Sequence, residues 1–584
     1  MSLSQLFSNI SSRRNVLAVW NQLGAWGHGM VYLALMLPFA IFRHVRIHGD
    51  EKVYVGQALE MLRAGHWWQQ IQFGEVKYIK GPMHYLLLIL GHKLFGFSML
   101  STVYMNFLLA ALAVVGLRAA GNYLLERGHV LRSVPAWLFA SSGAFVMFSF
   151  SSQMDSEVTS LYAIALSLSV LARHTNKNIF YALLWLTVGA AGTFKSPLHS
   201  CLLGVSVLAY FIASGEFFNG LLANPSRWLF VVAGVLFSGS GYLVPFVLDQ
   251  QRWLGTYMFR ETIDRQRFSD PASGFLLNNF IFHIFPWSIL VCQAIWIAFQ
   301  RIRNHNFKID ELTRVGLSFL LPTFLFFFGF GYLAPWYGLP MIPALVLLIV
   351  GQLAARPEPL KDIANALLPW VVVLMALVLV THAVFYDSTP WWHGSSGVLL
   401  TVVLILSFVV LEAVATGKRL SAKAGVFVGA GLFWCSALGM TAILGEAELH
   451  DARMVLQSTS APLNYNNIVK ENYNEWGYMA YMLGQPSEFS NSFEDLVKAG
   501  RNGQWMVFTS KEELNSFWTW LSQSGLQNEF LGHVDIRLWR RWPRNVSQLR
   551  EIWNQRSDTE NLWDRSSRHF MLMRLTEPQS HVQR

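Results

Sequence analysis

The chain has 584 residues, of which 53% are hydrophobic and only 14% are charged. A soluble protein carries roughly 25% charged residues, so this composition excludes a soluble protein and indicates a polytopic α-helical membrane protein. The net charge of +9 does not indicate a nucleic-acid partner, because many Lys and Arg residues fall in short loops between apolar segments, where they set orientation.

Apolar segments long enough, or nearly so, to cross a bilayer recur along the chain, and we expect about thirteen transmembrane helices. They run over residues 24–42, 100–119, 133–150, 157–172, 179–194, 197–213, 227–248, 279–300, 315–332, 337–353, 363–386, 396–416 and 424–445. The run 83–97 is apolar but short, and His84, His92 and Lys93 interrupt it, so we interpret it as an interfacial helix.

Acidic residues stand out at two helix ends. Asp50-Glu51 follows the first apolar segment, and Asp155 precedes the fourth with no Lys or Arg nearby. Asp50 is a fair N-cap for a helix that ends near Gly65, and capping alone could explain it. Capping does not explain Asp155 on the same side of the membrane. Together, Asp50 and Asp155 could act as a general base or hold a divalent metal ion, and the sequence leaves both roles open.

Cations lie in the same outer segments. Lys80 precedes the interfacial helix, and residues 249–277 include Arg260, Arg265 and Arg267. Lys and Arg bind phosphate, although interfacial cations more often lie along lipid headgroups. We interpret Lys195, at a second Lys-x-Pro turn, as such an interfacial lysine.

Several other residue types carry no site. His199 and His283 have no i,i+4 partner with metal-ligand spacing, and we interpret both as structural. The three cysteines lie inside apolar segments, which excludes a disulfide framework and a Cys-ligated zinc site. No nucleotide-binding or hydrolase motif occurs, so no nucleotide cofactor is expected.

Basic residues on one side place the N-terminus in the cytoplasm, and an odd number of spans then puts residues 446–584 outside. This segment is rich in Asp and Glu and predicts a small α/β domain. Residues 505–509, 534–539 and 570–575 are strand candidates, and a capping box opens a helix over 510–525. We therefore predict two domains: a transmembrane domain, residues 1–445 with outer loops 43–99 and 249–277, and an extracytoplasmic α/β domain, residues 446–584.

The order of these motifs resembles one family. Asp50-Glu51 with Tyr54, the Tyr-x-Lys-x-Pro element around Lys80, Asp155, the Lys-x-Pro turn at Lys195, Arg267-Phe268 and the Pro-x-Tyr-x-x-Pro turn around Tyr337 are similar to the GT-C membrane glycosyltransferases. The most similar branch contains the lipid A aminoarabinose transferase and the protein O-mannosyltransferase relatives. One departure is Lys80-Gly81-Pro82 where that family has Lys-Pro-Pro.

The resemblance implies site residues and substrates. It implies that Asp50, with Glu51 beside it, is the catalytic or metal-associated acid and that Asp155 is the second acid. Tyr54, Lys80, Arg267 and Tyr337, with Arg265 nearby, would surround the phosphate of a polyprenyl-phosphate sugar donor. We expect an inverting glycosyltransferase in the inner (plasma) membrane that acts at the periplasmic face on a lipid A-like lipid, glycan or protein acceptor. The alternatives are a transporter or flippase of a lipid-linked sugar, which would place its ionisable residues near the bilayer midplane, and a non-catalytic scaffold.

Overall fold

The computed structural model describes most of residues 24–356 and parts of the chain beyond residue 462. The described ranges are 24–41, 51–72, 75–78, 80–96, 98–126, 129, 131–255, 275–276, 278–285, 287–303, 310–329, 335–356, 359, 463–466, 487–490, 492–502, 505–508, 511–524, 530–540 and 567–575.

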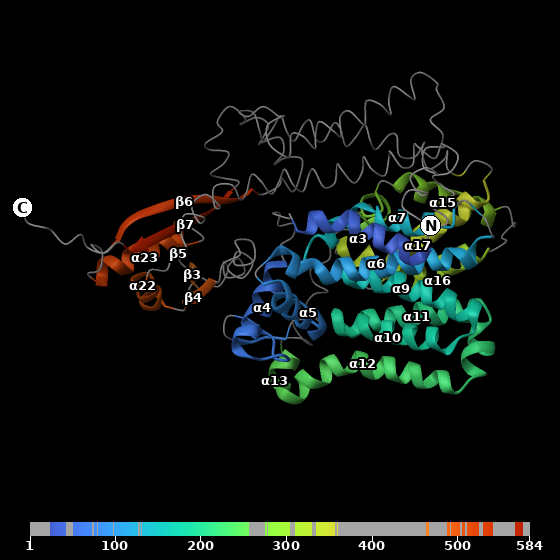
Figure 1. Ribbon diagram of the computed structural model, residues 1–584, viewed down its shortest axis with the longest axis horizontal. Coiled ribbons are helices and arrows are strands. Elements are labelled where there is room, and N and C mark those ends of the chain that lie inside the picture. Colours follow the sequence, from blue (N-terminus) through green and yellow to red (C-terminus); the bar gives the residue numbers. More distant parts are fainter. Residues whose placement is uncertain are drawn as a thin grey trace, which may run out of the picture.

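Helices form a bundle that dominates the molecule (Figure 1). In chain order they are α3 (Ala25–Ile41), α4 (Glu51–Ala64), α5 (Pro82–Phe95), α6 (Met99–Leu124), α7 (Val134–Ala140), α8 (Gly143–Ser149), α9 (Met154–Thr175), α10 (Asn178–Phe194), α11 (Pro197–Ala213), η1 (Phe217–Leu222), α12 (Ser226–Leu248), α13 (Gln250–Trp253), η4 (Asn278–Phe282), α15 (Ser288–Arg303), α16 (Glu311–Gly329), η5 (Pro335–Met341) and α17 (Ile342–Ala354). A two-residue hairpin, β1 (Ile71–Gln72) and β2 (Glu75–Val76), lies between α4 and α5.

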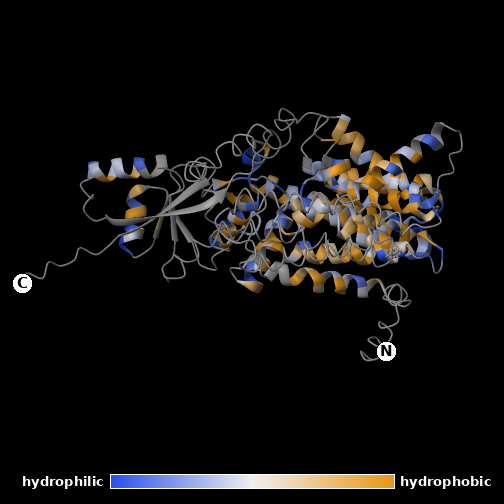
Figure 2. Cartoon of the chain, turned by 90° about the horizontal axis from the view of Figure 1, so that it is seen from above, coloured by the Kyte–Doolittle hydropathy of each residue, from blue (hydrophilic) through white to orange (hydrophobic). Residues whose placement is uncertain are grey.

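Four helical segments among the described residues are long and apolar enough to cross a membrane: Leu100–Leu124, Ser226–Leu248, Glu311–Gly329 and Trp336–Ala354. Figure 2 shows how strongly hydrophobic colour dominates the bundle. The predicted helical membrane protein is confirmed in this coarse form. The spans expected over 363–386, 396–416 and 424–445 lie outside the described residues, so the count of about thirteen stays a prediction.

The segment 133–150 is not the single helix that its apolar character predicts. It forms the short helices α7 and α8, separated at Ser141-Ser142. The Ser141 hydroxyl donates to the Trp137 carbonyl at 2.5 Å, and the Ser142 hydroxyl donates to the Leu138 carbonyl at 2.8 Å. The two serine side chains therefore hydrogen-bond carbonyl groups at the end of α7, where the helical ladder stops.

The segment 279–300 is interrupted as well. It begins as the π-helix η4, and the regular helix α15 starts only at Ser288. The two interruptions contact each other: the Gly143 N–H donates to the Phe285 carbonyl at 2.6 Å, and the Trp287 indole N–H donates to the Ser141 hydroxyl at 3.1 Å. Irregular backbone at membrane depth is tolerated where neighbouring protein supplies such partners. Hydropathy alone detects neither break.

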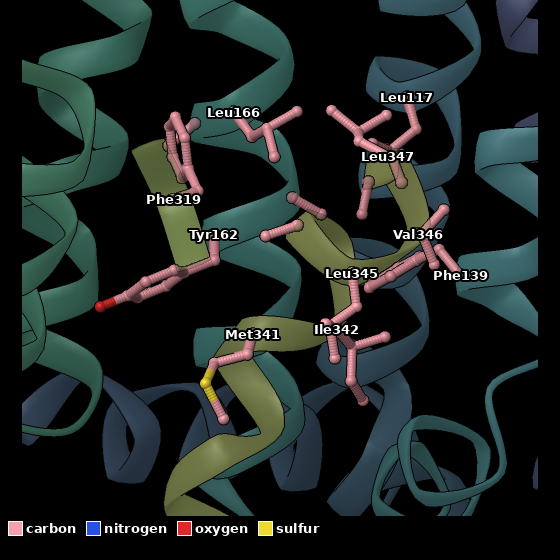
Figure 3. Packing of buried hydrophobic residues seen from close by; sticks show 14 of the residues in the cluster. Leu117, Phe139, Tyr162, Leu166, Phe319, Met341, Ile342, Leu345, Val346 and Leu347 are labelled. Atoms are coloured by element: carbon pink, nitrogen blue, oxygen red, sulfur yellow. The ribbon is translucent and has the colours of Figure 1, made fainter. Parts of the chain in front are cut away.

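The buried core lies between α6, α7, α9, α16 and the segment that joins η5 to α17. Figure 3 shows Leu117, Phe139, Leu166, Phe319 and Leu345 packed together in this region. All five side chains are buried. In contrast, α12 exposes large apolar side chains over much of its length, as a lipid-facing helix does.

Two helices of the bundle approach each other at backbone distance. A Cβ added at Gly189 of α10 would lie 2.4 Å from the Gly234 carbonyl oxygen of α12, and one at Gly192 would lie 2.0 Å from the Ser238 hydroxyl oxygen. Small residues at such interfaces allow helices to pack closely in membranes. At one end of the same pair, the Arg227 guanidinium lies 3.8 Å from the centre of the Tyr181 ring.

The chain beyond residue 462 forms a mixed five-stranded sheet with strand order β4-β3-β5-β7-β6. Its elements are β3 (Leu463–Asn466), β4 (Ser487–Ser490), α22 (Phe493–Arg501), β5 (Trp505–Phe508), α23 (Lys511–Ser524), β6 (Phe530–Arg540) and β7 (Ser567–Leu575). The elements expected at 505–509, 510–525, 534–539 and 570–575 are therefore present. The boundary at residue 446 falls outside the described residues and stays a prediction.

Candidate functional site

Polar side chains from α4, α5, α9 and the turn between α10 and α11 meet at one end of the bundle. In Figure 1, α4, α5 and α13 lie at the end of the bundle that faces the strands β3–β7. The first turn of α9 and the turn between α10 and α11 bring further charged residues to the same region. The sequence analysis placed these same segments together on the outer face.

Asp155 and Lys195 form a buried ion pair. Asp155 lies on the first turn of α9, Lys195 follows the last residue of α10, and a carboxylate oxygen of Asp155 accepts a hydrogen bond from the Lys195 ammonium. Lys195 is only 6% exposed. Our interpretation of Lys195 as an interfacial lysine is therefore wrong, because its ammonium points to a buried carboxylate instead of lipid headgroups.

The ring of Tyr337 lies beside the ion pair of Asp155 and Lys195. The Lys195 ammonium lies 5.2 Å from the centre of the Tyr337 ring, within the range of a cation–π contact. The ring itself stacks on Phe327 of α16 with 5.2 Å between ring centres. The structure thus brings together Asp155 and Tyr337, two residues that the sequence analysis singled out, and joins them through Lys195.

The Lys80 turn packs against the Lys195 turn. The Gly81 N–H donates to the Lys195 carbonyl at 3.3 Å, and a Cβ at Gly81 would lie 2.0 Å from the Thr193 carbonyl oxygen. The Gln70 side-chain amide donates to the Lys80 carbonyl at 2.5 Å and accepts from the Lys80 N–H at 3.3 Å. Lys80 is 9% exposed. Proline has no N–H and is bulkier, so this contact explains Gly81 where the family has proline.

The hydrogen bond from the Gly81 N–H to the Lys195 carbonyl places the Lys80 turn beside the Asp155–Lys195 pair. The first phosphate-binding residue expected from the sequence, Lys80, therefore lies in the same region as Asp155, Lys195 and Tyr337. The ammonium groups of Lys80 and Lys195 are the cations that this mostly buried region offers to an anionic ligand such as a phosphate.

Glu51 holds the turn that precedes α9. It is fully buried, and its carboxylate accepts the Ser152 N–H at 2.8 Å and the Ser151 hydroxyl at 3.2 Å. The Asn106 amide donates to the Ser151 carbonyl at 2.5 Å. These contacts fit a residue that positions the start of α9, and the catalytic role expected for Glu51 stays a prediction.

Tyr54 lies one turn further along α4, beside a pair that the sequence analysis did not identify. His84 Nδ1 and Glu157 Oε2 are 2.8 Å apart, and both side chains are almost completely buried. The Tyr54 ring meets the His84 ring edge-on with 5.4 Å between centres. One signal in the sequence could have found the pair: a second acid two residues after Asp155, and a histidine four residues after Lys80.

Asp50, Arg265 and Arg267 lie outside the described residues, so their predicted roles stay predictions. The segment that leads toward the two arginines does approach the Lys80 turn. Trp253 of α13 packs against the cluster of Tyr78 and Tyr242, and burial and the nearby Asp249 carboxylate raise the pKa of Tyr78. The two outer loops expected from the sequence therefore meet near the site.

The described residues fit a divalent metal poorly. They contain no group of three His, Cys, Asp or Glu side chains that could hold one. The predicted metal ligand Asp155 already has a cation, the Lys195 ammonium, against its carboxylate. The other predicted ligand, Asp50, lies outside the described residues, so metal binding stays a prediction.

Comparison with known proteins gives the same family as the motifs. Residues 79–243 match the family described as "Dolichyl-phosphate-mannose-protein mannosyltransferase". A protein of Aquifex aeolicus (strain VF5) described as "Uncharacterized protein" is 25% identical over 358 residues, 58% of this chain. The match spans 66% of that relative's length, just under two thirds.

The fold is similar to that of ArnT from Cupriavidus metallidurans. The crystal structure of ArnT bound to undecaprenyl phosphate superposes with a TM-score of 0.64 and 15% identity, over 94% of this chain and 98% of ArnT. The apo structure of ArnT gives the same TM-score and coverage with 16% identity. At this identity the likeness shows the fold alone, while the matched segment contains Lys80, Asp155 and Lys195. The resemblance drawn from the motifs is therefore confirmed by the family match over residues 79–243 and by the ArnT-like fold.

Proposed function

We propose that this protein transfers a sugar from a polyprenyl-phosphate donor to a lipid A-like lipid, glycan or protein acceptor at the extracytoplasmic face of the inner membrane. The observation that carries this proposal is the meeting of the Lys80 turn with the Asp155–Lys195 pair at one end of the bundle. Support also comes from ArnT, a protein of similar fold whose structure contains undecaprenyl phosphate.

The proposed reaction is a displacement at the anomeric carbon of the donor sugar. An acceptor hydroxyl or amine forms the new bond to this carbon while the bond from carbon to phosphate oxygen breaks. The polyprenyl phosphate leaves with the electron pair, and Lys80, together with Arg265 and Arg267, neutralises its charge. Asp50 takes the proton from the acceptor.

Asp155 and Lys195 have a supporting role in this proposal. The carboxylate of Asp155 holds the Lys195 ammonium at the first turn of α9, while the ring of Tyr337 lies against the same ammonium. A phosphate that enters can then contact a cation whose position is fixed before binding. Preorganised charge of this kind lowers the cost of reorganisation during the reaction.

The position of the charges favours an enzyme over a lipid-linked sugar flippase. Transporters commonly place ionisable residues near the bilayer midplane. Here Lys80, Asp155 and Lys195 lie at helix ends.

Three experiments test the proposal. Mass spectrometry of lipids and envelope glycans from cells with and without the protein should reveal the glycoconjugate that carries the transferred sugar. The purified protein, given the matching polyprenyl-phosphate sugar and acceptor, should release polyprenyl phosphate. Lys80→Ala should weaken binding of the lipid phosphate by about 1.5–3 kcal/mol, the range for a charge-assisted hydrogen bond. No change in any glycoconjugate, together with no lipid phosphate released in vitro, would refute the function.

A further inference from the structure

A buried histidine–carboxylate pair joins α5 to α9. His84 Nδ1 lies 2.8 Å from Glu157 Oε2, and the two side chains are 1% and 3% exposed. His84 Nδ1–H donates to the carboxylate in this arrangement. The two residues are 73 positions apart in the sequence. The pair is therefore a tertiary contact between two helices and not a feature of either one.

Folding stability does not account for this pair. Burying a carboxylate and an imidazole is costly, and apolar side chains of similar volume are often equally stabilising or better. In addition, His84 Nε2 is buried and has no hydrogen-bond partner among the described residues. An unsatisfied buried polar atom adds a further cost. A contact that costs stability and is nevertheless present suggests a role in the geometry of the site.

The location of the pair indicates that role. His84 lies on the first turn of α5, four residues after Lys80, and Glu157 lies on the first turn of α9, two residues after Asp155. Glu157 therefore shares a helical turn with Asp155, and His84 lies on the helical turn that directly follows Lys80 and the N-cap Gly81. A change in the distance between His84 and Glu157 would move Lys80 relative to the Asp155–Lys195 pair.

Two neighbouring contacts show that the arrangement around the pair is specific. The Tyr54 and Tyr85 rings both meet the His84 ring edge-on, with 5.4 Å and 5.9 Å between ring centres. The Tyr85 hydroxyl in turn donates to the Gln57 side chain of α4 at 2.7 Å. The imidazole is thus held on three sides by α4, α5 and α9.

We infer that His84 and Glu157 are positioning residues that set the distance between Lys80 and the Asp155–Lys195 pair for binding of the donor phosphate. Neither residue needs to touch the donor. The inference rests on the proposed function, because it gives the pair a role in holding the lipid phosphate.

The decisive variant replaces both partners with apolar residues. His84→Leu combined with Glu157→Leu removes the hydrogen bond without leaving an unpaired buried charge. We expect its midpoint of thermal unfolding in detergent to be unchanged or higher. Its affinity for undecaprenyl phosphate, measured by native mass spectrometry, should nevertheless fall about 10-fold or more, with a matching rise in the KM for the donor, since small misplacements of binding groups are costly.

Three further variants, His84→Asn, the single His84→Leu and Tyr210→Phe, separate positioning from packing. In His84→Asn the side-chain amide can still donate to Glu157, so it should recover most of the affinity that His84→Leu loses. This comparison also decides the matter if the doubly apolar variant does not fold. Tyr210→Phe is the matched control, because it removes a hydrogen bond of 2.7 Å to Glu311, beyond the other end of α9. It should leave binding of undecaprenyl phosphate unchanged.

The outcomes distinguish the two levels of the reasoning. If the wild-type protein does not bind undecaprenyl phosphate, the proposed function is refuted, and this inference is refuted with it. If the wild type binds and the doubly apolar variant binds equally well, only the positioning role is refuted. Equal losses in His84→Asn and His84→Leu would also refute it, because the hydrogen bond to Glu157 would then not matter.

Discussion

The substitution Gly81→Ala tests the contact between the two lysine turns most directly. The added Cβ would lie 2.0 Å from the Thr193 carbonyl oxygen, short of the 3.4 Å of ordinary contact by about 1.4 Å. The two nearest atoms, the carbonyl oxygen and carbon of Thr193, belong to the backbone and cannot rotate away. The Lys80 turn must therefore move from the end of α10, and the hydrogen bond of 3.3 Å from the Gly81 N–H to the Lys195 carbonyl is lost or stretched.

We expect a larger effect on activity than on stability. Overpacking of this kind costs about 1–3 kcal/mol of folding free energy. A displacement of about 1 Å at a site that binds substrate can lower the rate about 10²-fold. The assay is release of polyprenyl phosphate by the purified variant at several donor concentrations, with the midpoint of thermal unfolding measured in the same detergent.

Gly56→Ala is the matched control for this test. The same change on α4 meets no atom within 4 Å, and alanine favours a helix over glycine by about 1 kcal/mol. This variant should keep its activity and be equally or more stable. Wild-type rates and donor KM in Gly81→Ala would refute the reasoning, since they would show that the spacing of the two turns does not control transfer.

Three further predictions concern the same end of the bundle and the topology. Glu51→Ala should lower the free energy of unfolding by roughly 3 kcal/mol or more, because two hydrogen bonds to a buried carboxylate are lost at about 1.5–3 kcal/mol each. Thermal unfolding measures this change. A change under about 1 kcal/mol would contradict the role of Glu51 in holding the turn before α9. Asp155→Asn should abolish transfer and cost about 3–5 kcal/mol by leaving the Lys195 ammonium buried without its counter-charge. Adding Lys195→Met should restore stability but not transfer, and an active double variant would remove the pair from the mechanism. Finally, in a cysteine-free background, Ser522→Cys should react with impermeant thiol reagents once the outer barrier is permeabilised, while His305→Cys should stay protected; the reverse pattern would invert the orientation.

Much of the helical architecture could be predicted from hydropathy, because a long apolar segment in a membrane protein has few alternatives to a helix. α10, α11 and α12 begin and end within a few residues of the expected spans. The breaks in 133–150 and 279–300 could not be predicted. They depend on hydrogen bonds between segments more than a hundred residues apart, such as that from Trp287 to Ser141.

The candidate site, too, could be predicted from the sequence only in part. Motif order identified Asp155, Lys80 and Tyr337, because each stands at a helix end among apolar residues. The role of Lys195 was misjudged since lysine at a helix end usually reaches the lipid headgroups, and only the fold shows that the Asp155 carboxylate lies within its reach. His84 was seen merely as an interruption of an apolar run, because its partner Glu157 lies on another helix.

The close contact between α10 and α12 also has a mechanical consequence. At roughly 1.5 Å per residue, the 23 residues of α12 extend about 35 Å, more than the hydrocarbon thickness of about 30 Å. A helix that is too long usually tilts, but the backbone contact at Gly189 and Gly234 prevents α12 from tilting without α10. The two helices must therefore tilt together. Near the Lys80 turn, α12 contacts α5, because a Cβ at Gly241 would lie 3.1 Å from Pro82. We therefore expect the acyl-chain length of the surrounding lipid to affect the end of the protein where the lysines lie.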